Sequence, residues 1–455
     1  MRRHPSSYRD PSGFVYREDG ILYRQVNPIY FEEYHAIRDS GVFDSLFKKN
    51  WLVHHEEISE DAGKIILKPE QIPFITYPYE WTFTQYKHAA QLTLRLQMFL
   101  LENDFSLKDA SAFNVTFHKG RAIFIDTLSI ERYKKNKPWR ALKQFSEHFF
   151  APLFMAQKFG SRHLKTLQLQ INGCDLNEVK NHLSMKDRFN PVIHSHINLI
   201  SKDEKESSKN RNNSLSIDIK LSKKDQLKIL KVLESYISKM ELQENTEWSS
   251  YYTETNYKES SFNAKKDLIR SWTEEMFISR AVDLGGNDGT FGALILPKID
   301  QLMVCDIDQS AIDHCYKKFL KKNKVFCLVA DLMQPAPGIG FSNKERSSFI
   351  DRLIEWKPDL SMALALIHHI TLTGNVPFEM SAAFFSRLSP YLIIEFPDRD
   401  DSWVKFILDS KRDARHLFDF YGIDAFAKAY QEYFIIHKSE KIKGTERTLF
   451  LMQRK

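Results

Sequence analysis

Short apolar runs alternate with helical stretches throughout the second half of the chain. After residue 280 these runs are AVDLG (281–285), LMVCDID (302–308), VFCLVADL (325–332), LSMALALI (360–367) and YLIIEF (391–396). Strands separated by helices favour a parallel, doubly wound sheet. A last run, TLFLM (448–452), suits an antiparallel strand added at the end. The pattern therefore predicts an α/β domain built on a mostly parallel sheet.

The first half follows a different pattern, in which strands come as hairpins. Asp19-Gly20 separates the β-prone segments 13–18 and 21–26. Asp-Gly between β-prone residues is a strong hairpin signal. The other elements expected here are a strand at 64–69, a helix at 84–102, a hairpin of 114–118 with 122–126, and helical segments over 139–169.

A polar stretch separates the two halves. Residues 201–214, SKDEKESSKNRNNS, have almost no apolar side chains to bury, which is typical of an exposed linker. A charged amphipathic helix is predicted from about 223 to 241. We therefore expect a first domain at 1–200, a polar linker and helix at 201–246, and a second domain at 247–455.

The composition limits the class of protein. A chain of 455 residues is too long for one ordinary core, and 42% hydrophobic with 27% charged residues are globular proportions. The 65 Lys and Arg against 59 Asp and Glu leave a charge of +6, which falls short of the basic surplus typical of a dedicated nucleic-acid binder.

Cysteine usage and the length of the apolar runs bear on the compartment. The four cysteines include no C-x-x-C pair, so we expect neither a disulfide framework nor a zinc knuckle. The first ten residues lack the apolar region of a signal peptide, and no run approaches the ~20 residues of a membrane helix. We expect a cytoplasmic protein with no membrane contact, and its oligomeric state stays open.

A glycine-rich turn follows the first strand of the second half. The segment AVDLGGNDGTFG (281–292) runs from Asp283 into a turn that holds Gly285, Gly286, Asn287 and Gly289. Glycines let the backbone turn tightly and approach a ligand where a Cβ would collide. The helix that follows would offer free N–H groups. The G-G-x-x-G spacing fits a nicotinamide dehydrogenase poorly, so another cofactor is expected.

Acidic residues follow the next two strands. Asp306 and Asp308 lie about 20 residues beyond the glycines, where a carboxylate can accept both hydroxyls of an adenosine ribose. Asp331 ends the following run, within reach of an adenine amino group. Because α/β proteins bind ligands at the carboxyl ends of their strands, we expect the turn and these acids to share one site.

Together these motifs resemble class I S-adenosylmethionine-dependent methyltransferases. The resemblance implies a Rossmann-like domain with a mostly parallel seven-stranded sheet, and S-adenosylmethionine as the cofactor. The stretches 359–377 and 393–401 and the segment 251–257 are similar to those of bacterial NoeA-like nodulation proteins, and the likeness covers essentially the whole chain. In that family such segments surround the methyltransferase core. We expect Tyr257 to help close over the cofactor.

Polar residues at the last two strand ends are candidates for catalysis. Methyl transfer requires acceptor and methyl group in line, and a base where the acceptor keeps its proton. His368 and His369 follow the run 360–367, and Glu395 lies in the run 391–396. Imidazole titrates near neutrality, so His369 is the preferred base, with Glu395 to orient it or to bind substrate. The alternative is that either histidine only fills space beneath the cofactor.

A metal ion held by His368, His369 and Glu395 is a further alternative, since imidazole and carboxylate ligate divalent ions. Adjacent residues of a strand point to opposite faces, so two neighbouring histidines are poorly placed to share an ion. We therefore expect no metal.

A second constellation lies in the first half. Asp109 and Asn114 stand in D-x-x-x-x-N spacing, and a hairpin delivers Asp126 to a strand end. Kinases use one Asp to position the acceptor hydroxyl, and an Asn with a second Asp to hold magnesium. The half resembles the aminoglycoside-phosphotransferase and protein-kinase-like superfamily, which implies an α+β domain. It lacks a Gly-rich phosphate loop and a V-A-I-K lysine, and Arg24 is the only basic residue well placed on its strand.

These departures favour a degenerate kinase-like domain that binds substrate or a partner, with nucleotide or magnesium binding left open. The whole chain is then interpreted as a methyltransferase acting on an oxygen of a carbohydrate, small metabolite or protein. It has no Asn-Pro-Pro-Tyr tetrapeptide after the fourth strand, which disfavours methylation of a base or amide nitrogen. The alternatives are a bifunctional kinase–methyltransferase and a non-catalytic S-adenosylmethionine-binding scaffold protein. The acceptor is unknown.

Overall fold

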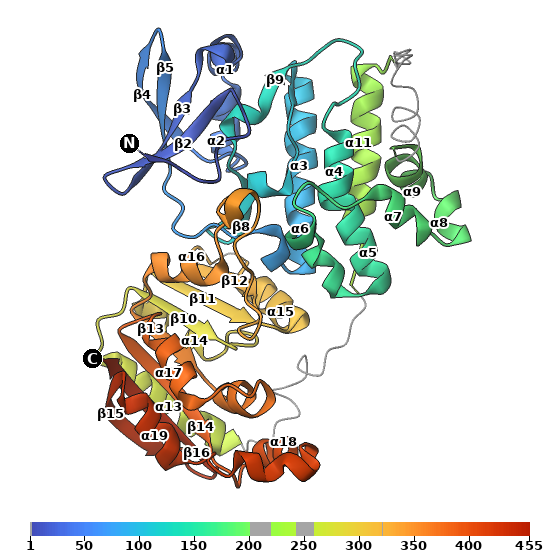
Figure 1. Cartoon of the computed structure of the whole chain (residues 1–455). Helices are drawn as coiled ribbons and strands as arrows, with labels where there is room; N and C mark the ends of the chain where they lie inside the picture. The colour runs from blue at the N-terminus through green and yellow to red at the C-terminus, as the bar shows by residue number, and fades with distance from the viewer. Residues whose placement is uncertain (1, 201–219, 243–258, 321) are drawn as a thin grey trace. The chain divides into compact units, whose positions relative to one another are not determined.

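The chain forms two compact units. The computed structural model describes residues 2–200, 220–242, 259–320 and 322–455 (Figure 1). The first unit comprises Met1–Glu244 together with Gly338–Ser347, and the second comprises Asn245–Pro337 and Ser348–Lys455. The polar stretch 201–214 and Tyr257 lie outside the described residues.

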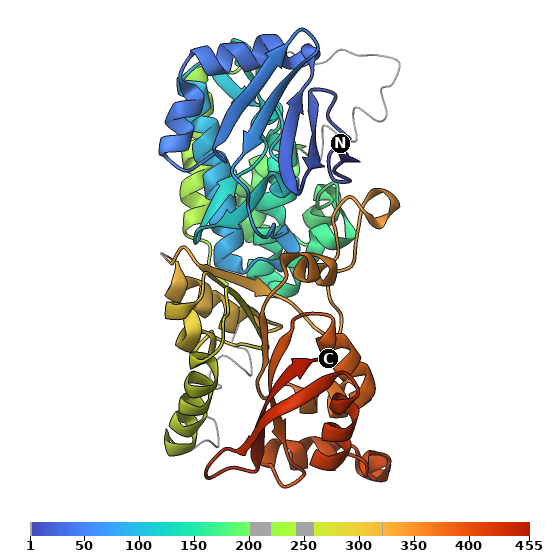
Figure 2. The same ribbon diagram turned by 90° about the vertical axis from the view of Figure 1, so that its left-hand side faces the viewer.

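A five-stranded sheet opens the first unit, in the order β1-β2-β3-β5-β4. Its strands are β1 Arg2–Arg3, β2 Gly13–Glu18, β3 Ile21–Val26, β4 His55–Asp61 and β5 Lys64–Pro69. The hairpin predicted at Asp19-Gly20 is confirmed: both residues have positive φ, 49° and 79°, as the tightest hairpin turn requires. Helices α1 (Phe31–Asp39) and α2 (Val42–Lys48) lie beside this sheet (Figure 2).

The central helix of the first unit is α3, Phe83–Glu102, which confirms the helix predicted at 84–102. Thr82 caps it, because its hydroxyl accepts the Gln85 N–H at 3.1 Å while the Gln85 side chain accepts the Thr82 N–H at 2.9 Å. Helix α11 (Lys223–Ser238) packs on α3. The helix expected in the linker therefore belongs to the first unit.

The rest of the first unit consists of short elements. The second predicted hairpin is confirmed as β7 (Val115–His118) with β8 (Arg121–Phe124), and β6 (Phe105–Leu107) pairs with β9 (Ile130–Arg132). The further helices are α4 Leu142–Phe145, α5 Ala151–Phe159, α6 Thr166–Leu169, α7 Leu176–Asn181, α8 Met185–Phe189 and α9 Pro191–Ile193.

Gly338–Ser347 joins the first unit through one buried acid. Glu345 is 2% exposed, and its carboxylate accepts hydrogen bonds from the Tyr8 hydroxyl at 2.6 Å and from the Arg9 guanidinium at 2.7 and 2.9 Å. Arg9 and Tyr8 hold the pKa of Glu345 at about 2, below its usual value, although burial alone would raise it. Nothing in the sequence pattern indicated this contact.

A seven-stranded mixed sheet forms the second unit, in the order β12-β11-β10-β13-β14-β16-β15. Its strands are β10 Arg280–Leu284, β11 Gln301–Asp306, β12 Val325–Val329, β13 Leu360–Ala363, β14 Tyr391–Pro397, β15 Phe434–Lys441 and β16 Arg447–Arg454. The first five are parallel, and β16 pairs antiparallel with β14. This confirms a mostly parallel sheet with a late antiparallel strand. The red strands β15 and β16 lie together toward one edge in both views (Figures 1 and 2).

The order of the strands reverses at β10. The chain proceeds from β10 to β11 and β12 on one side, and then returns to β13 and β14 on the other. Such a reversal leaves a crevice at the carboxyl ends of the two central strands, where open α/β sheets bind ligands. The helices of this unit are α13 Glu259–Glu274, α14 Gly292–Ile295, α15 Gln309–Phe319, α16 Phe349–Trp356, α17 Phe378–Ser386, α18 Ser402–Ser410 and α19 Ile423–Gln431. Across the described ranges of both units, every helix is too short or too polar to span a membrane.

Helix α11 supplies the first testable prediction. Leu233 is fully buried against the first unit, whereas Val232, one position earlier, is 56% exposed. We expect Leu233→Ala to destabilise the first unit by about 2–5 kcal/mol, because it leaves a cavity. Val232→Ala on the same helix should change stability little. Urea denaturation of the full chain measures both, and equal midpoints for the two variants would contradict the assignment of α11 to this core.

Candidate functional site

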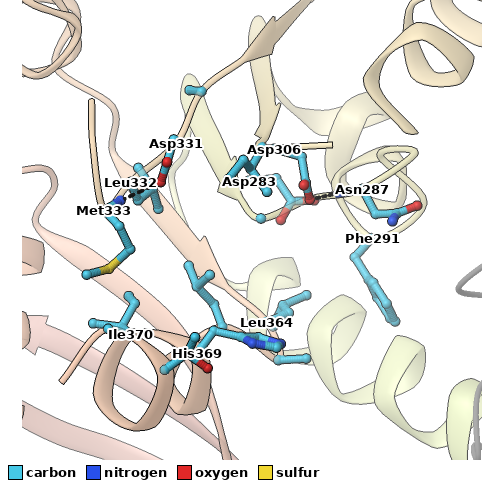
Figure 3. A pocket seen from close by; sticks show the side chains of 18 of the residues that line it. Asp283, Asn287, Phe291, Asp306, Asp331, Leu332, Met333, Leu364, His369 and Ile370 are labelled. Carbon is cyan, nitrogen blue, oxygen red and sulfur yellow. Dashed lines mark hydrogen bonds between the residues drawn. The ribbon is translucent and has the colours of Figure 1, made fainter. Parts of the chain in front are cut away.

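A cavity of about 460 Å³ opens at the carboxyl ends of β10, β11, β12 and β13. It therefore lies at the reversal of strand order. Figure 3 shows Asp306 and Asn287 on one side of it, Asp331 and Met333 on another, and His369 and Ile370 facing them. The lining residues are Phe262, Lys265, Asp283, Gly285, Gly286, Asn287, Phe291, Asp306, Ile307, Ala330, Asp331, Leu332, Met333, Leu364, Ala365, Leu366, His369, Ile370, Thr373 and Gly374.

The turn after β10 forms the floor of the cavity. Gly285, Asn287 and Gly289 have φ of 70°, 49° and 74°, so the left-handed conformation recurs at every second residue. Asn tolerates this conformation better than other residues with a side chain. Glycine is required at position 286 for a different reason, because an added Cβ would lie only 2.8 Å from the Asp283 carboxyl carbon. The G-G-N-D-G sequence of the turn thus meets two constraints. Gly285, Asn287 and Gly289 adopt the left-handed conformation, and Gly286 leaves room for the Asp283 carboxyl group.

Asp283 is the penultimate residue of β10 and is 1% exposed. Its Oδ2 accepts the backbone N–H of Gly292 at 3.0 Å, so the short helix α14 turns its first N–H to this acid rather than to the cavity. No described residue donates a hydrogen bond to its other oxygen, Oδ1. Burial raises the pKa of Asp283 to about 7. A half-satisfied buried carboxyl that lines a cavity is a candidate ligand contact.

The structure gives different roles to Asp306, the last residue of β11, and Asp308, which lies two residues beyond it. Asp306 lines the cavity, and its two oxygens accept the backbone N–H groups of Asn287 and Asp308, each at 2.9 Å. Asp308 is 5% exposed and caps α15, accepting the Ala311 N–H at 2.8 Å. The carboxylate of Asp308 is engaged as a helix cap and Asp308 is not among the residues that line the cavity, so of the two predicted cofactor contacts the geometry favours Asp306. Burial raises the pKa of Asp306.

Asp331 lies two residues beyond β12, at the rim of the cavity. Its carboxylate accepts the Met333 N–H at 2.8 Å, which fixes its direction (Figure 3). Ile307 and Leu332 line the cavity beside it, so this end combines apolar side chains with one acid.

His368 and His369 begin a helical turn and are not at a strand end. Strand β13 ends at Ala363, and a π-helical segment spans His369–Thr373. The two rings lie beside each other, with centroids 4.1 Å apart and planes tilted by 40°, so the expected opposite orientation is wrong. His369 lines the cavity, whereas His368 is only 2% exposed. Burial, and then the charge of Arg447, lower the pKa of His369 to about 4; burial takes that of His368 well below its usual value.

Glu395 is bound by two cations from other elements. Its buried carboxylate accepts hydrogen bonds from Lys265 on α13 and, at 3.2 Å, from Arg447 on β16. Arg447 also forms a bidentate pair with Asp401, at 2.6 and 3.2 Å. We therefore assign Glu395 to a buried network of alternating charges. Within the described ranges, no three Cys, His, Asp or Glu side chains gather closely enough to hold a metal ion.

Lys265 is a charged cavity residue that the sequence pattern missed. It is 3% exposed, contacts Glu395, and its ammonium lies 4.2 Å from the centre of the Phe291 ring. Burial lowers its pKa, although Glu395 opposes this. A signal was present: Lys265 falls four and seven positions before Ile269 and Trp272, on the buried face of α13. A lysine in register with buried apolar residues is unusual unless it is paired.

The three polar residues singled out in the first half lie together in the first unit. The side chain of Asn114 hydrogen-bonds to Asp109, and the charge of Asp126 acts on Asp109 as well. Arg24, the basic residue noted in the sequence, lies on β3 and forms an ion pair with Asp126 at 2.5 Å. The predicted cluster therefore exists, and Arg24 is part of it.

No model of a known protein family matches the chain. Solved methyltransferase structures are similar to part of it. The N-methyltransferase NodS from Bradyrhizobium japonicum WM9 is 12% identical, with 43% of this chain and 97% of that chain covered and a TM-score of 0.31. Magnesium protoporphyrin IX methyltransferase from Synechocystis PCC 6803 is 14% identical, with 46% and 93% covered and a TM-score of 0.31.

Among curated proteins, the chain is similar over almost its entire length to nodulation protein NoeA of Rhizobium meliloti (strain 1021). The two are 29% identical over 470 residues, which are 99% of this chain and 96% of that protein.

Asp283 supplies the prediction for this site. Its carboxyl has a pKa of about 7 in the folded chain, against an ordinary 3.8. A raised pKa means that the folded state holds the proton more tightly than the unfolded state. The contribution of the Asp283 carboxyl to the free energy of unfolding is therefore fully present below about pH 4 and is lost as pH rises through 7. Asp283→Asn should therefore gain stability relative to the wild type between those values. The gain has an upper limit of roughly 4 kcal/mol, since each pKa unit corresponds to about 1.4 kcal/mol.

Urea denaturation of both proteins over that pH range measures the difference. Asp308→Asn is the matched control, because Asn caps a helix as well as Asp does. A stability difference between Asp283→Asn and the wild type that does not vary with pH would show that the acid is ionised at all these values.

Proposed function

We propose that this protein is an enzyme that transfers a methyl group from S-adenosylmethionine to an acceptor. The observation that carries the proposal is the position of Asp306 on the cavity, at the end of β11 and next to the turn of Gly285 to Gly289. A carboxylate at this place in a doubly wound sheet binds ribose hydroxyls. The backbone N–H bonds from Asn287 and Asp308 hold it in place for that contact.

The adenine end of the cofactor is assigned to the rim formed by Asp331 and its apolar neighbours. Ile307, Leu332 and Met333 offer apolar surface for a flat ring, and Asp331 offers an acceptor for an amino group. The cavity volume of about 460 Å³ lies in the range of small-molecule sites.

The amino-acid end of the cofactor carries an ammonium and a carboxylate, and the opposite end of the cavity has a partner for each. The unpaired oxygen of Asp283 is an acceptor for the ammonium, and Lys265 is a cation for the carboxylate. Phe262 and Phe291, whose rings lie 5.2 Å apart, line the cavity beside them. A negative charge from the ligand favours the protonated form of Lys265, and a positive one favours the ionised form of Asp283.

The acceptor is assigned to the side of the cavity that His369 lines. S-adenosylmethionine supplies an electrophilic methyl group on a positively charged sulfur. The residues then hold an acceptor oxygen opposite that sulfur, so that the C–O bond forms as the C–S bond breaks and its electron pair stays on sulfur. His369 is uncharged at neutral pH because of its lowered pKa, so its ring nitrogen can accept the acceptor's proton. The acceptor class is a carbohydrate, a small metabolite or a protein.

The first unit is proposed to be a kinase-like domain that binds the acceptor or a partner. Its antiparallel sheet, central helix α3 and the cluster of Asp109, Asn114 and Asp126 support this assignment. The similarity to nodulation protein NoeA extends over 99% of this chain, so the relative contains counterparts of both units. A binding role for the first unit explains why both are kept in one chain.

Calorimetry with S-adenosylmethionine tests the cofactor assignment. The wild type should bind, and Asp306→Asn should weaken binding roughly ten- to a hundredfold, because hydrogen bonds to a charged group contribute about 1.5–3 kcal/mol. Asp308→Asn should bind like the wild type, since that side chain caps α15. Binding that is lost with Asp308→Asn and kept with Asp306→Asn would reverse the assignment.

Turnover tests the chemistry. With methyl-labelled S-adenosylmethionine and a cell extract as the source of acceptors, the wild type should release S-adenosylhomocysteine and label one acceptor class. His369→Gln should lower this rate about 10²–10⁴-fold and leave cofactor affinity unchanged. Because the His369 pKa is about 4, activity should persist below pH 6.5 rather than fall there. Cofactor binding with no transfer to any acceptor would favour a protein that only senses S-adenosylmethionine. An unchanged rate in His369→Gln would show that His369 is not the general base.

A further inference from the structure

The cluster in the first unit has the residue types of a magnesium site. Asp109 precedes a short helical turn that ends at Asn114, and Asp126 follows β8. The Ile125 N–H donates to the Asn114 carbonyl at 2.8 Å, which ties the two segments together. Burial raises the pKa of Asp109, and the nearby carboxylate of Asp126 raises it further. Two acids and an amide oxygen side by side are the donors that Mg²⁺ prefers.

Arg24 changes what this cluster can bind. Its Nη1 donates to Oδ1 of Asp126 at 2.5 Å, and its Nη2 donates to the Ile125 carbonyl at 3.2 Å. The Ser129 hydroxyl donates to the other oxygen, Oδ2, and the Leu128 N–H donates to Oδ1 at 3.3 Å. Both oxygens of Asp126 therefore already accept hydrogen bonds, and its charge is compensated. Burial alone would raise the pKa of Asp126, but Arg24 and Ser129 hold it below its usual value.

A divalent cation does not fit beside this guanidinium. Arginine stays protonated at every pH a protein experiences, so it cannot leave the pair by losing its proton. The pair is also shielded, because only 14% of the Arg24 side chain and 19% of the Asp126 side chain are exposed. A metal ion would have to displace Arg24 and then stand next to its positive charge.

We propose that Arg24 is a built-in cation that takes the place of a metal ion at Asp109, Asn114 and Asp126. The first unit then binds neither Mg²⁺ nor a magnesium–nucleotide complex at this cluster, and it performs no phosphoryl transfer there. The same ion pair joins β3 of the five-stranded sheet to the segment after β8, so it orders the unit as a bound metal would. The proposal concerns the first unit alone and does not depend on methyl transfer.

The first test uses the wild-type full chain. Mn²⁺ binding is followed by electron paramagnetic resonance, and Mg²⁺–ATP binding by the melting temperature of the first unit. We expect no protein-bound Mn²⁺ signal and no shift in melting temperature with Mg²⁺–ATP. Binding of either ligand by the wild type that is lost in Asp126→Asn would overturn the proposal.

The second test removes the built-in cation. Arg24→Met keeps the length of the side chain and frees the Asp126 carboxylate, so this variant should gain a Mn²⁺ site with a Kd on the order of a millimolar. The double variant Arg24→Met with Asp126→Asn should lose that site again. Arg17→Met is the matched control, because it removes the same charge from β2 of the same hairpin and should gain nothing.

The two tests separate the outcomes. A gain in Arg24→Met that requires Asp126 supports the proposal. A wild type and an Arg24→Met variant that both fail to bind Mn²⁺ would overturn it, because something other than Arg24 would then exclude the ion. If Arg24→Met does not fold, Arg24→Gln takes its place with the same expected gain, and the wild-type measurement stands independently.

Discussion

Four buried charged side chains organise the second unit around its cavity. Lys265, Glu395, Arg447 and Asp401 come from α13, β14, β16 and the start of α18, and each is at most 8% exposed. Two cations alternate with two anions, so the cluster carries no net charge. Removing one partner from such a group costs about 3–5 kcal/mol, because an uncompensated charge is left in the interior. The network therefore fixes α13 against the sheet, and this is what brings Lys265 and Phe262 to the cavity.

The same burial sets the protonation states within the cavity. His369 has a pKa of about 4 and Asp283 one of about 7, so both are largely uncharged in mildly acidic solution. Because these two groups are uncharged there, the cavity favours a ligand that carries ionised groups of its own. A zwitterionic amino-acid group attached to a positively charged sulfur has that property. The unpaired oxygen of Asp283 then gains a partner from the ligand, and the ammonium of Lys265 gains a second anionic partner beside Glu395.

Both units use a cation from a distant segment to satisfy a buried acid, with opposite consequences. In the second unit Lys265 compensates Glu395 and still lines the cavity, so the pair leaves a ligand site open. In the first unit Arg24 covers Asp126 together with Ser129, so the pair fills the place where a ligand would bind. Whether a ligand site remains beside the buried acid thus depends on where its cation lies. The sequence around Glu395 and Asp126 does not show this difference.

The sequence by itself determined the local elements and the edge of the sheet where the site lies. Apolar runs predicted β10, β11 and β12, and the acids that follow them reach one edge because parallel strands share their direction. Only the tertiary structure decided which acids face the cavity: Asp306 does and Asp308 caps a helix, two residues apart. It also decided the partner of Glu395, which is 130 residues away on α13. Local backbone preferences are written in neighbouring residues, whereas the partner of a buried charge depends on which segments the folded chain brings together.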